Sequence, residues 1–135
     1  MAAVESGECV FCALPPERII FSNEHAVAIN DAYPVSPGHC LVIPRRHVAD
    51  WWELSNDERD SITELVDQVR TQLLDTHHPQ GFNVGFNDGA AAGQTVFHFH
   101  MHVIPRYKGD VPDPRGGVRH VIPAKANYVA LGEVP

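Results

Sequence analysis

The stretch at residues 95–105, TVFHFHMHVIP, constrains the fold of this 135-residue chain most strongly. Its side chains alternate, with His98, His100 and His102 separated by single apolar residues. Side chains in a strand point alternately to opposite faces, so the pattern predicts a strand over this stretch. One face carries the three histidines and the other is apolar. We expect the apolar face to pack on a helix and the histidine face to meet a polar environment.

Turn signals and apolar periodicity divide the rest of the chain into further short elements. Residues 18–31 predict a hairpin, and residues 39–44 and 81–88 predict two more strands. Ser55 and Glu58 fit a capping box, and the apolar face of a helix follows them until Pro79. The result is an α+β fold, in which an antiparallel sheet of about five strands packs on one main helix, with a shorter helix besides.

Length and composition predict one domain over residues 1–135, with an N-terminal arm at 1–17 and a C-terminal extension at 107–135. No apolar run approaches the roughly 20 residues that span a bilayer, and no signal peptide pattern is present. We therefore expect a cytoplasmic protein without a membrane partner. The formal charge of −7 argues against nonspecific binding to nucleic acid, but it permits a small phosphorylated ligand.

Two chemical interpretations of the three histidines compete with the simpler one that they are half-exposed strand residues. Imidazole is a common zinc ligand, but the first and third histidines lie roughly 13 Å apart along a straight strand. Such histidines do not converge easily on one ion. The alternative divides the tasks, so that one imidazole attacks as a nucleophile while its neighbours orient it and handle protons.

The motif at residues 98–104, HFHMHVI, resembles that of the histidine triad (HIT) superfamily at every position. The similarity extends to NDAYPVSPGHCLVIPRRHV at residues 30–48 and to NDGAAAGQTV at residues 87–96. It covers most of residues 9–106. The resemblance implies an antiparallel sheet with helices, a homodimer, and hydrolysis or transfer at the α-phosphate of a nucleotide, with an adenine nucleotide as the expected partner.

The resemblance also implies roles for individual residues. His100 would be the nucleophile that forms a covalent nucleotidyl-histidine, with its Nδ1 held by a backbone carbonyl. The other implied catalytic residues are His102, His98 and His39. Four further positions match residues that bind substrate: Asp31 would contact the ribose, and Asn87, Gln94 and Thr95 would contact the phosphates. Fixed donors of this kind suit the charge that develops on a transferring phosphoryl group.

Cys9 and Cys12 form a C-x-x-C motif, and the chain has a third cysteine, Cys40. A thioredoxin-like role would require a βαβ context that the neighbouring residues lack. Two interpretations of the C-x-x-C motif remain, a structural zinc site and a pair of reduced thiols. Zinc-containing bacterial members of the superfamily resemble this chain here, which implies that Cys9, Cys12, His47 and His98 bind a structural zinc ion. Cys40 lies in an apolar strand and is expected in the core.

Three functional hypotheses follow. The first is a nucleotide hydrolase or transferase acting through His100, and the C-terminal extension resembles a bacterial subgroup near the branch that cleaves dinucleoside polyphosphates. Within this hypothesis a nucleoside phosphoramidate is the alternative substrate. The second is a nucleotide-binding or signalling module with little turnover. The third is a zinc hydrolase that uses the histidines directly as ligands, which predicts that chelation abolishes activity.

Overall fold

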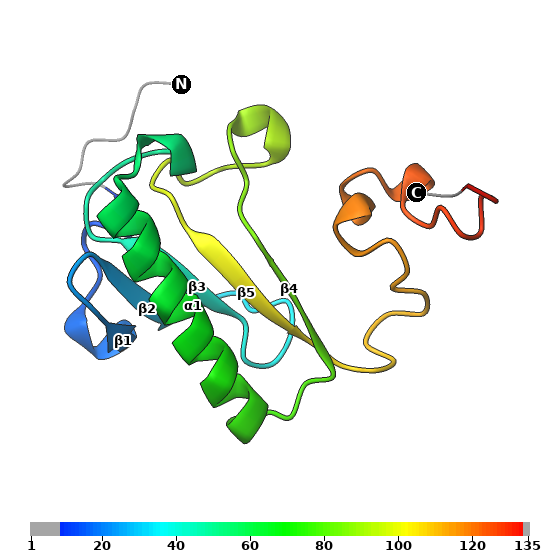
Figure 1. The fold of residues 1–135 in the computed structure, drawn as a ribbon, viewed down its shortest axis with the longest axis horizontal. Coiled ribbons are helices and arrows are strands. Elements are labelled where there is room, and N and C mark those ends of the chain that lie inside the picture. Colours follow the sequence, from blue (N-terminus) through cyan, green and yellow to red (C-terminus); the bar gives the residue numbers. More distant parts are fainter. Residues whose placement is uncertain (1–8, 134–135) are drawn as a thin grey trace.

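The computed structural model describes residues 9–133, in which five strands form one antiparallel sheet in the order β1-β2-β3-β5-β4. The helix α1, Asn56–Thr76, lies across one face of this sheet (Figure 1). The predicted α+β fold is thereby confirmed. The first eight residues of the predicted arm and the last two of the extension lie outside the described residues. The strands are β1 Ile19–Ser22, β2 Ala26–Asn30, β3 Cys40–Pro44, β4 Gly81–Gly85 and β5 Met101–Arg106.

The helix begins and packs as its sequence predicts. The Ser55 hydroxyl accepts the Glu58 N–H at 3.1 Å, and the Glu58 carboxylate accepts the Ser55 N–H at 3.0 Å, which completes the capping box. Arg46 binds the same carboxylate and holds its pKa at about 2. The predicted apolar face meets the sheet in a core that also contains Cys40, and its buried members are Ile62, Leu65, Val69 and Leu73.

The predicted histidine strand is shorter than expected. β5 begins at Met101, so His102 alone of the three histidines lies in the ladder. Residues before it turn toward the loop after β3, where the Phe99 N–H donates to the Val48 carbonyl at 2.7 Å. The alternation of faces survives this departure, because Phe99 is buried in the core beneath α1. The expected strand over 95–105 is therefore wrong in extent but right about the faces.

The second helical component of the fold consists of 3-10 segments rather than a second α-helix within residues 9–133. One of them, Trp51–Glu53, precedes α1, and another, Gly117–Val121, lies in the C-terminal extension that follows β5. Figure 1 shows this C-terminal segment extending past β4, away from α1. In the described part of the chain no helix has the length and hydropathy needed to cross a bilayer.

Candidate active site and metal centre

A cavity of about 480 Å³ lies on the sheet face opposite α1. Neighbouring residues of β5 point to opposite faces of the sheet. Val103 points into the core beneath α1, so His102 points to the other face, where it lines the cavity. His100 and the predicted substrate-binding residues Asp31, Asn87 and Thr95 also line it. Segments that are far apart in the sequence therefore bring five of the predicted site residues to one cavity.

The hydrogen bond of His100 fixes which ring nitrogen carries the proton. Its Nδ1 lies 2.9 Å from the His98 carbonyl oxygen, which accepts from Nδ1–H. The neutral ring then carries its lone pair on Nε2, the nitrogen available as a nucleophile. The Phe11 ring packs edge-on against it, with ring centroids 5.0 Å apart. The expected backbone contact of His100 is present, and His98 supplies the carbonyl.

A chain of hydrogen bonds fixes the tautomer of His102 in the opposite sense. The Val35 N–H donates to Nδ1 of His39 at 3.1 Å, so a neutral His39 carries its proton on Nε2. That nitrogen lies 2.9 Å from Nδ1 of His102 and donates to it. The remaining proton of His102 is then on Nε2. His102 thus presents a donor where His100 presents a lone pair, with ring centroids 5.1 Å apart.

Burial keeps the rings of His39 and His102 neutral. Desolvation is the main cause that lowers the pKa of His102 to about 4, and the nearby rings of His100 and His39 lower it further. Burial also lowers the pKa of His39, although the Asp31 carboxylate, 3.4 Å away, opposes this. Both rings are therefore uncharged at neutral pH, as the hydrogen-bond chain requires.

We expect the stability of the protein to fall as the pH is lowered from about 6.5 to about 4. In this window an unfolded histidine binds a proton that folded His102 does not bind, so protons favour the unfolded state. Urea unfolding at several pH values measures the slope. His102→Asn retains an acceptor for His39 but does not titrate, and its slope should be smaller by up to about 1.4 kcal/mol per pH unit. Equal slopes would contradict the assignment.

Gln94 takes a different position from the one predicted. Its side chain is buried among backbone groups, accepting the Gly89 N–H at 2.8 Å and donating to the carbonyls of Ala49 and Val96. It does not line the cavity, so the expected direct phosphate contact is not supported by its position. Because its amide joins both ends of the 89–96 loop, it shapes the loop from which Thr95 reaches the cavity.

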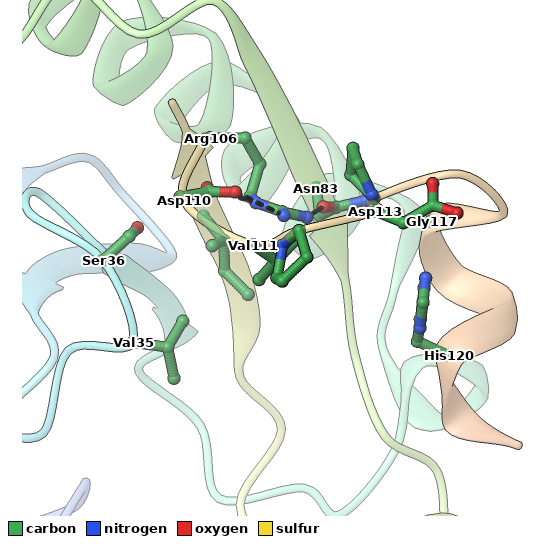
Figure 2. A pocket seen from close by; sticks show the side chains of 12 residues that line it. Val35, Ser36, Asn83, Arg106, Asp110, Val111, Asp113, Gly117 and His120 are labelled. Carbon is green, nitrogen blue, oxygen red and sulfur yellow. Dashed lines mark hydrogen bonds and ion pairs between the residues drawn. The ribbon is translucent and has the colours of Figure 1, made fainter. Parts of the chain in front are cut away.

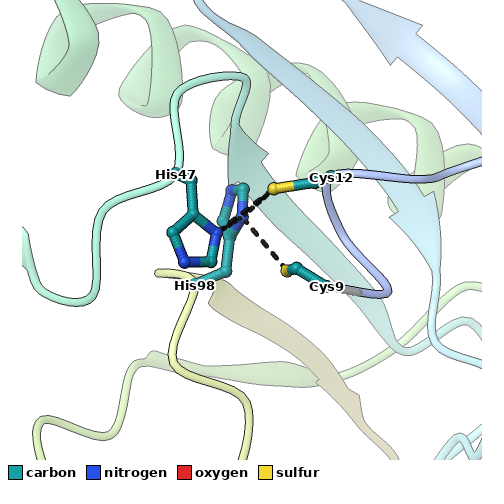
Figure 3. A group of neighbouring side chains, drawn as sticks. All are labelled: Cys9, Cys12, His47 and His98. Carbon is teal, nitrogen blue, oxygen red and sulfur yellow. Dashed lines mark hydrogen bonds between the residues drawn. The ribbon is translucent and has the colours of Figure 1, made fainter. Parts of the chain in front are cut away.

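The four predicted metal ligands converge beside the cavity (Figure 3). Nδ1 of His98 lies 3.5 Å from the Cys9 sulfur, 3.4 Å from the Cys12 sulfur and 3.1 Å from Nδ1 of His47. The Cys12 sulfur lies 3.2 Å from the same His47 nitrogen. All four ligand atoms lie within 4.8 Å of one another. The sequence therefore identified a real cluster.

The chemistry of these donors fits zinc. A tetrahedral Zn²⁺ ion with ordinary Zn–S and Zn–N bonds separates its ligand atoms by about 3.3 to 3.8 Å, close to the distances found here. Nε2 of His98 donates to the Pro44 carbonyl at 2.7 Å, which leaves the lone pair of Nδ1 for the cluster. Burial lowers the pKa of His98, so this nitrogen is held unprotonated and ready to bind a cation. Nδ1 of His47 faces it at 3.1 Å.

Several residues that line the cavity were not predicted as site residues, among them Phe11, Tyr33 and Arg18. Phe11 lies between Cys9 and Cys12 in the sequence and contacts the His100 ring. The predicted zinc site brings these cysteines to His98, so it already implied that Phe11 lies near the histidines. Tyr33 is 88% exposed at the cavity in the proline-rich loop, and Arg18 reaches it from the segment before β1. Neither stands out in the sequence, since an exposed tyrosine and a single arginine are common on any surface.

Comparison with known proteins agrees with this geometry. Residues 14–109 match the model of the HIT domain. The chain is 41% identical over 107 residues to a HIT-like protein of Mycoplasma genitalium, covering 76% of each chain. It is 32% identical to an adenylylsulfatase of Arabidopsis thaliana, covering 76% of this chain and 54% of the relative. A zinc-bound histidine triad protein of Mycobacterium smegmatis superposes with a TM-score of 0.71 at 33% identity, covering 96% of this chain and 100% of the other. The chain belongs to the histidine triad (HIT) family.

Proposed function

We propose that the protein is a nucleotide hydrolase or transferase that acts at the α-phosphate through a covalent intermediate on His100. The observation that carries this proposal is the opposite tautomers of two neighbouring rings in one cavity. Nδ1–H of His100 donates to a carbonyl, so its Nε2 offers a lone pair, while Nδ1 of His102 accepts, so its Nε2 offers a proton. An attacking group and a hydrogen-bond donor thereby stand side by side.

In the first step Nε2 of His100 attacks the α-phosphorus and the bond from phosphorus to the leaving oxygen breaks. The leaving group departs with the electron pair of that bond, stabilised by the Nε2–H of His102. The His98 carbonyl stabilises the positive charge that develops on the His100 ring. Water then attacks the same phosphorus and gives up a proton to the solvent, and the P–N bond breaks with its electron pair returning to Nε2. A nucleoside monophosphate is released and His100 is restored.

The walls of the cavity suit a nucleotide. The apolar side chains of Phe11 and Leu41 are placed to meet a base, and the Asp31 carboxylate is placed to accept from ribose hydroxyls. Asn87 and Thr95 are placed to donate to phosphate oxygens, with Gln94 holding the loop that carries Thr95. We propose an adenine nucleotide as the substrate moiety, in agreement with the adenylylsulfatase among the relatives.

A dinucleoside polyphosphate such as diadenosine tetraphosphate is the proposed substrate, and a nucleoside phosphoramidate is the second candidate. Cleavage of diadenosine tetraphosphate in H₂¹⁸O tests the position of attack by mass spectrometry. We expect ¹⁸O in the AMP product and none in ATP, since water enters at the α-phosphorus. Label in ATP would place the attack at the β-phosphorus and contradict the proposal. Turnover of an AMP phosphoramidate alone would favour the second candidate.

We further propose that Cys9, Cys12, His47 and His98 hold a structural zinc ion, which would supply no chemistry to the reaction. The donor set and its distances support this, as does the zinc-bound relative from Mycobacterium smegmatis. The ion would tie the segment around Cys9 and Cys12 to the sheet beside His100.

We also propose a homodimer, because β4 is an edge strand of the sheet and an edge strand can pair with a strand of another chain. Light scattering of the purified protein measures the molar mass. A value of one chain, independent of concentration, would contradict the dimer.

A further inference from the structure

The cavity that His100 and His102 line is called the catalytic cavity below. A second cavity, of about 530 Å³, lies on the same face of the sheet. Figure 2 shows Val35, from the loop after β2, on one side of it and His120, from the C-terminal segment, on the other. Ile104 of β5 forms part of its floor, and Val111 projects into it from the chain that follows β5. The two cavities are similar in volume.

The sheet register makes the two cavities neighbours. β4 places Gly85 beside His102 and Asn83 beside Ile104. His102 lines the catalytic cavity, whereas Ile104 and Asn83 line the second one. His102 and Ile104 are two residues apart on β5, which corresponds to about 6.8 Å along the strand. The two cavities are therefore lined by neighbouring positions on the same face of β5. Asn87, just beyond β4, lines the catalytic cavity, so β4 leads from one cavity to the other as well.

The charges in the second cavity are already paired. The Arg106 guanidinium binds both carboxylate oxygens of Asp110, at 2.8 and 2.9 Å, and donates to the Asn83 side chain at 2.7 Å. Asp113 pairs in turn with Arg115 at 3.0 Å. A cavity with compensated charges has little attraction for a free phosphate. Its apolar walls and polar rim instead fit a flat, uncharged heterocycle with hydrogen-bonding edges.

We propose that the second cavity receives the nucleoside at the far end of a dinucleoside polyphosphate whose α-phosphate lies at His100. This rests on the function proposed above and deepens it. In an in-line displacement the leaving group departs on the side of the phosphorus away from the nucleophile. The order His100, His102, Ile104 along the chain offers the leaving polyphosphate a path over His102 toward the second cavity.

A matched pair of substrates tests this assignment. Diadenosine tetraphosphate and adenosine 5′-tetraphosphate share the same polyphosphate and differ in the second nucleoside. We expect kcat/KM for the dinucleoside to be higher by about tenfold, the size of effect that one stacked base supplies. Val111→Trp fills the cavity and should remove this preference while leaving cleavage of adenosine tetraphosphate unchanged. Val121→Trp is the control, because Val121 is 79% exposed in the same segment and does not line the cavity.

The outcomes separate this inference from the function it rests on. Equal kcat/KM for both substrates in the unmodified protein, or an equal effect of Val111→Trp on both, overturns the second cavity as a nucleoside site. Turnover of neither substrate overturns the proposed dinucleoside polyphosphate substrate. Calorimetric binding to the His100→Asn variant still tests the cavity in that case, since diadenosine tetraphosphate should bind about tenfold more tightly than adenosine tetraphosphate. Equal affinities there overturn the assignment, and His120→Ala repeats the test should Val111→Trp not fold.

Discussion

Replacing His100 with alanine is expected to lower kcat for diadenosine tetraphosphate by about a thousandfold or more, the scale seen when an enzyme loses its nucleophile. The substituted side chain has no atom to replace Nε2, and the neighbouring His102 offers a proton in place of a lone pair. Steady-state release of AMP, measured by chromatography, gives the rate. Binding should persist, because the residues proposed to hold ribose and phosphates are unchanged.

The matched control for this prediction is His25→Ala, because His25 precedes β2 and does not line the catalytic cavity. That variant should retain the activity of the unmodified protein. His100→Asn should bind substrate with little change in Kd and show no burst of product. Full turnover by His100→Ala would mean that water attacks the phosphorus directly, and the covalent mechanism would then be wrong. Loss of both binding and turnover, with a lowered unfolding temperature, would assign His100 a structural role.

The parts of the fold that local chemistry determines could be predicted from the sequence. The capping box at Ser55, the apolar face of α1 and the hairpin of β1 and β2 each depend on residues close together in the chain. The alternation around the histidines also predicted correctly that Phe99 and His100 would face opposite ways. Interactions between distant segments decided the rest.

Two residues show where the sequence alone was insufficient. Residues 95–100 lie outside the ladder because Phe99 bonds to the Val48 backbone, 51 positions away in the chain, and no local pattern encodes that contact. Gln94 was expected to contact the phosphates because the resemblance to the histidine triad superfamily implies that role. Its burial against the backbone of two loops became evident only in three dimensions.

His98 connects the proposed metal centre to the proposed nucleophile. Its Nδ1 faces both cysteines, its Nε2 donates to the Pro44 carbonyl, and its own carbonyl accepts from His100. One fully buried residue therefore fixes the position of the ligand cluster and the tautomer of the His100 ring. A change at the cluster is expected to affect stability first, and catalysis only through the position of this carbonyl.

The double substitution Cys9→Ser and Cys12→Ser is expected to reduce zinc from about one ion per chain to nearly none and to lower the unfolding temperature by about 10 °C or more. Two of the four tetrahedral ligands are lost, and the segment that places Phe11 against His100 is no longer tied to the sheet. Elemental analysis and thermal unfolding of the same samples measure both effects. A metal-free protein with unchanged unfolding temperature would contradict the zinc site.

Cys40→Ala provides the matched control, since Cys40 is a buried thiol of the core that lies outside the cluster. It should lower stability modestly through the lost packing and retain its zinc. Chelation of the unmodified protein, assayed well below the unfolding temperature, then separates the two roles that zinc can have. A structural ion predicts that most activity survives while the unfolding temperature falls, because the proposed nucleophile is an imidazole held by a backbone carbonyl. Complete loss of turnover in a sample that remains folded would instead support a zinc hydrolase.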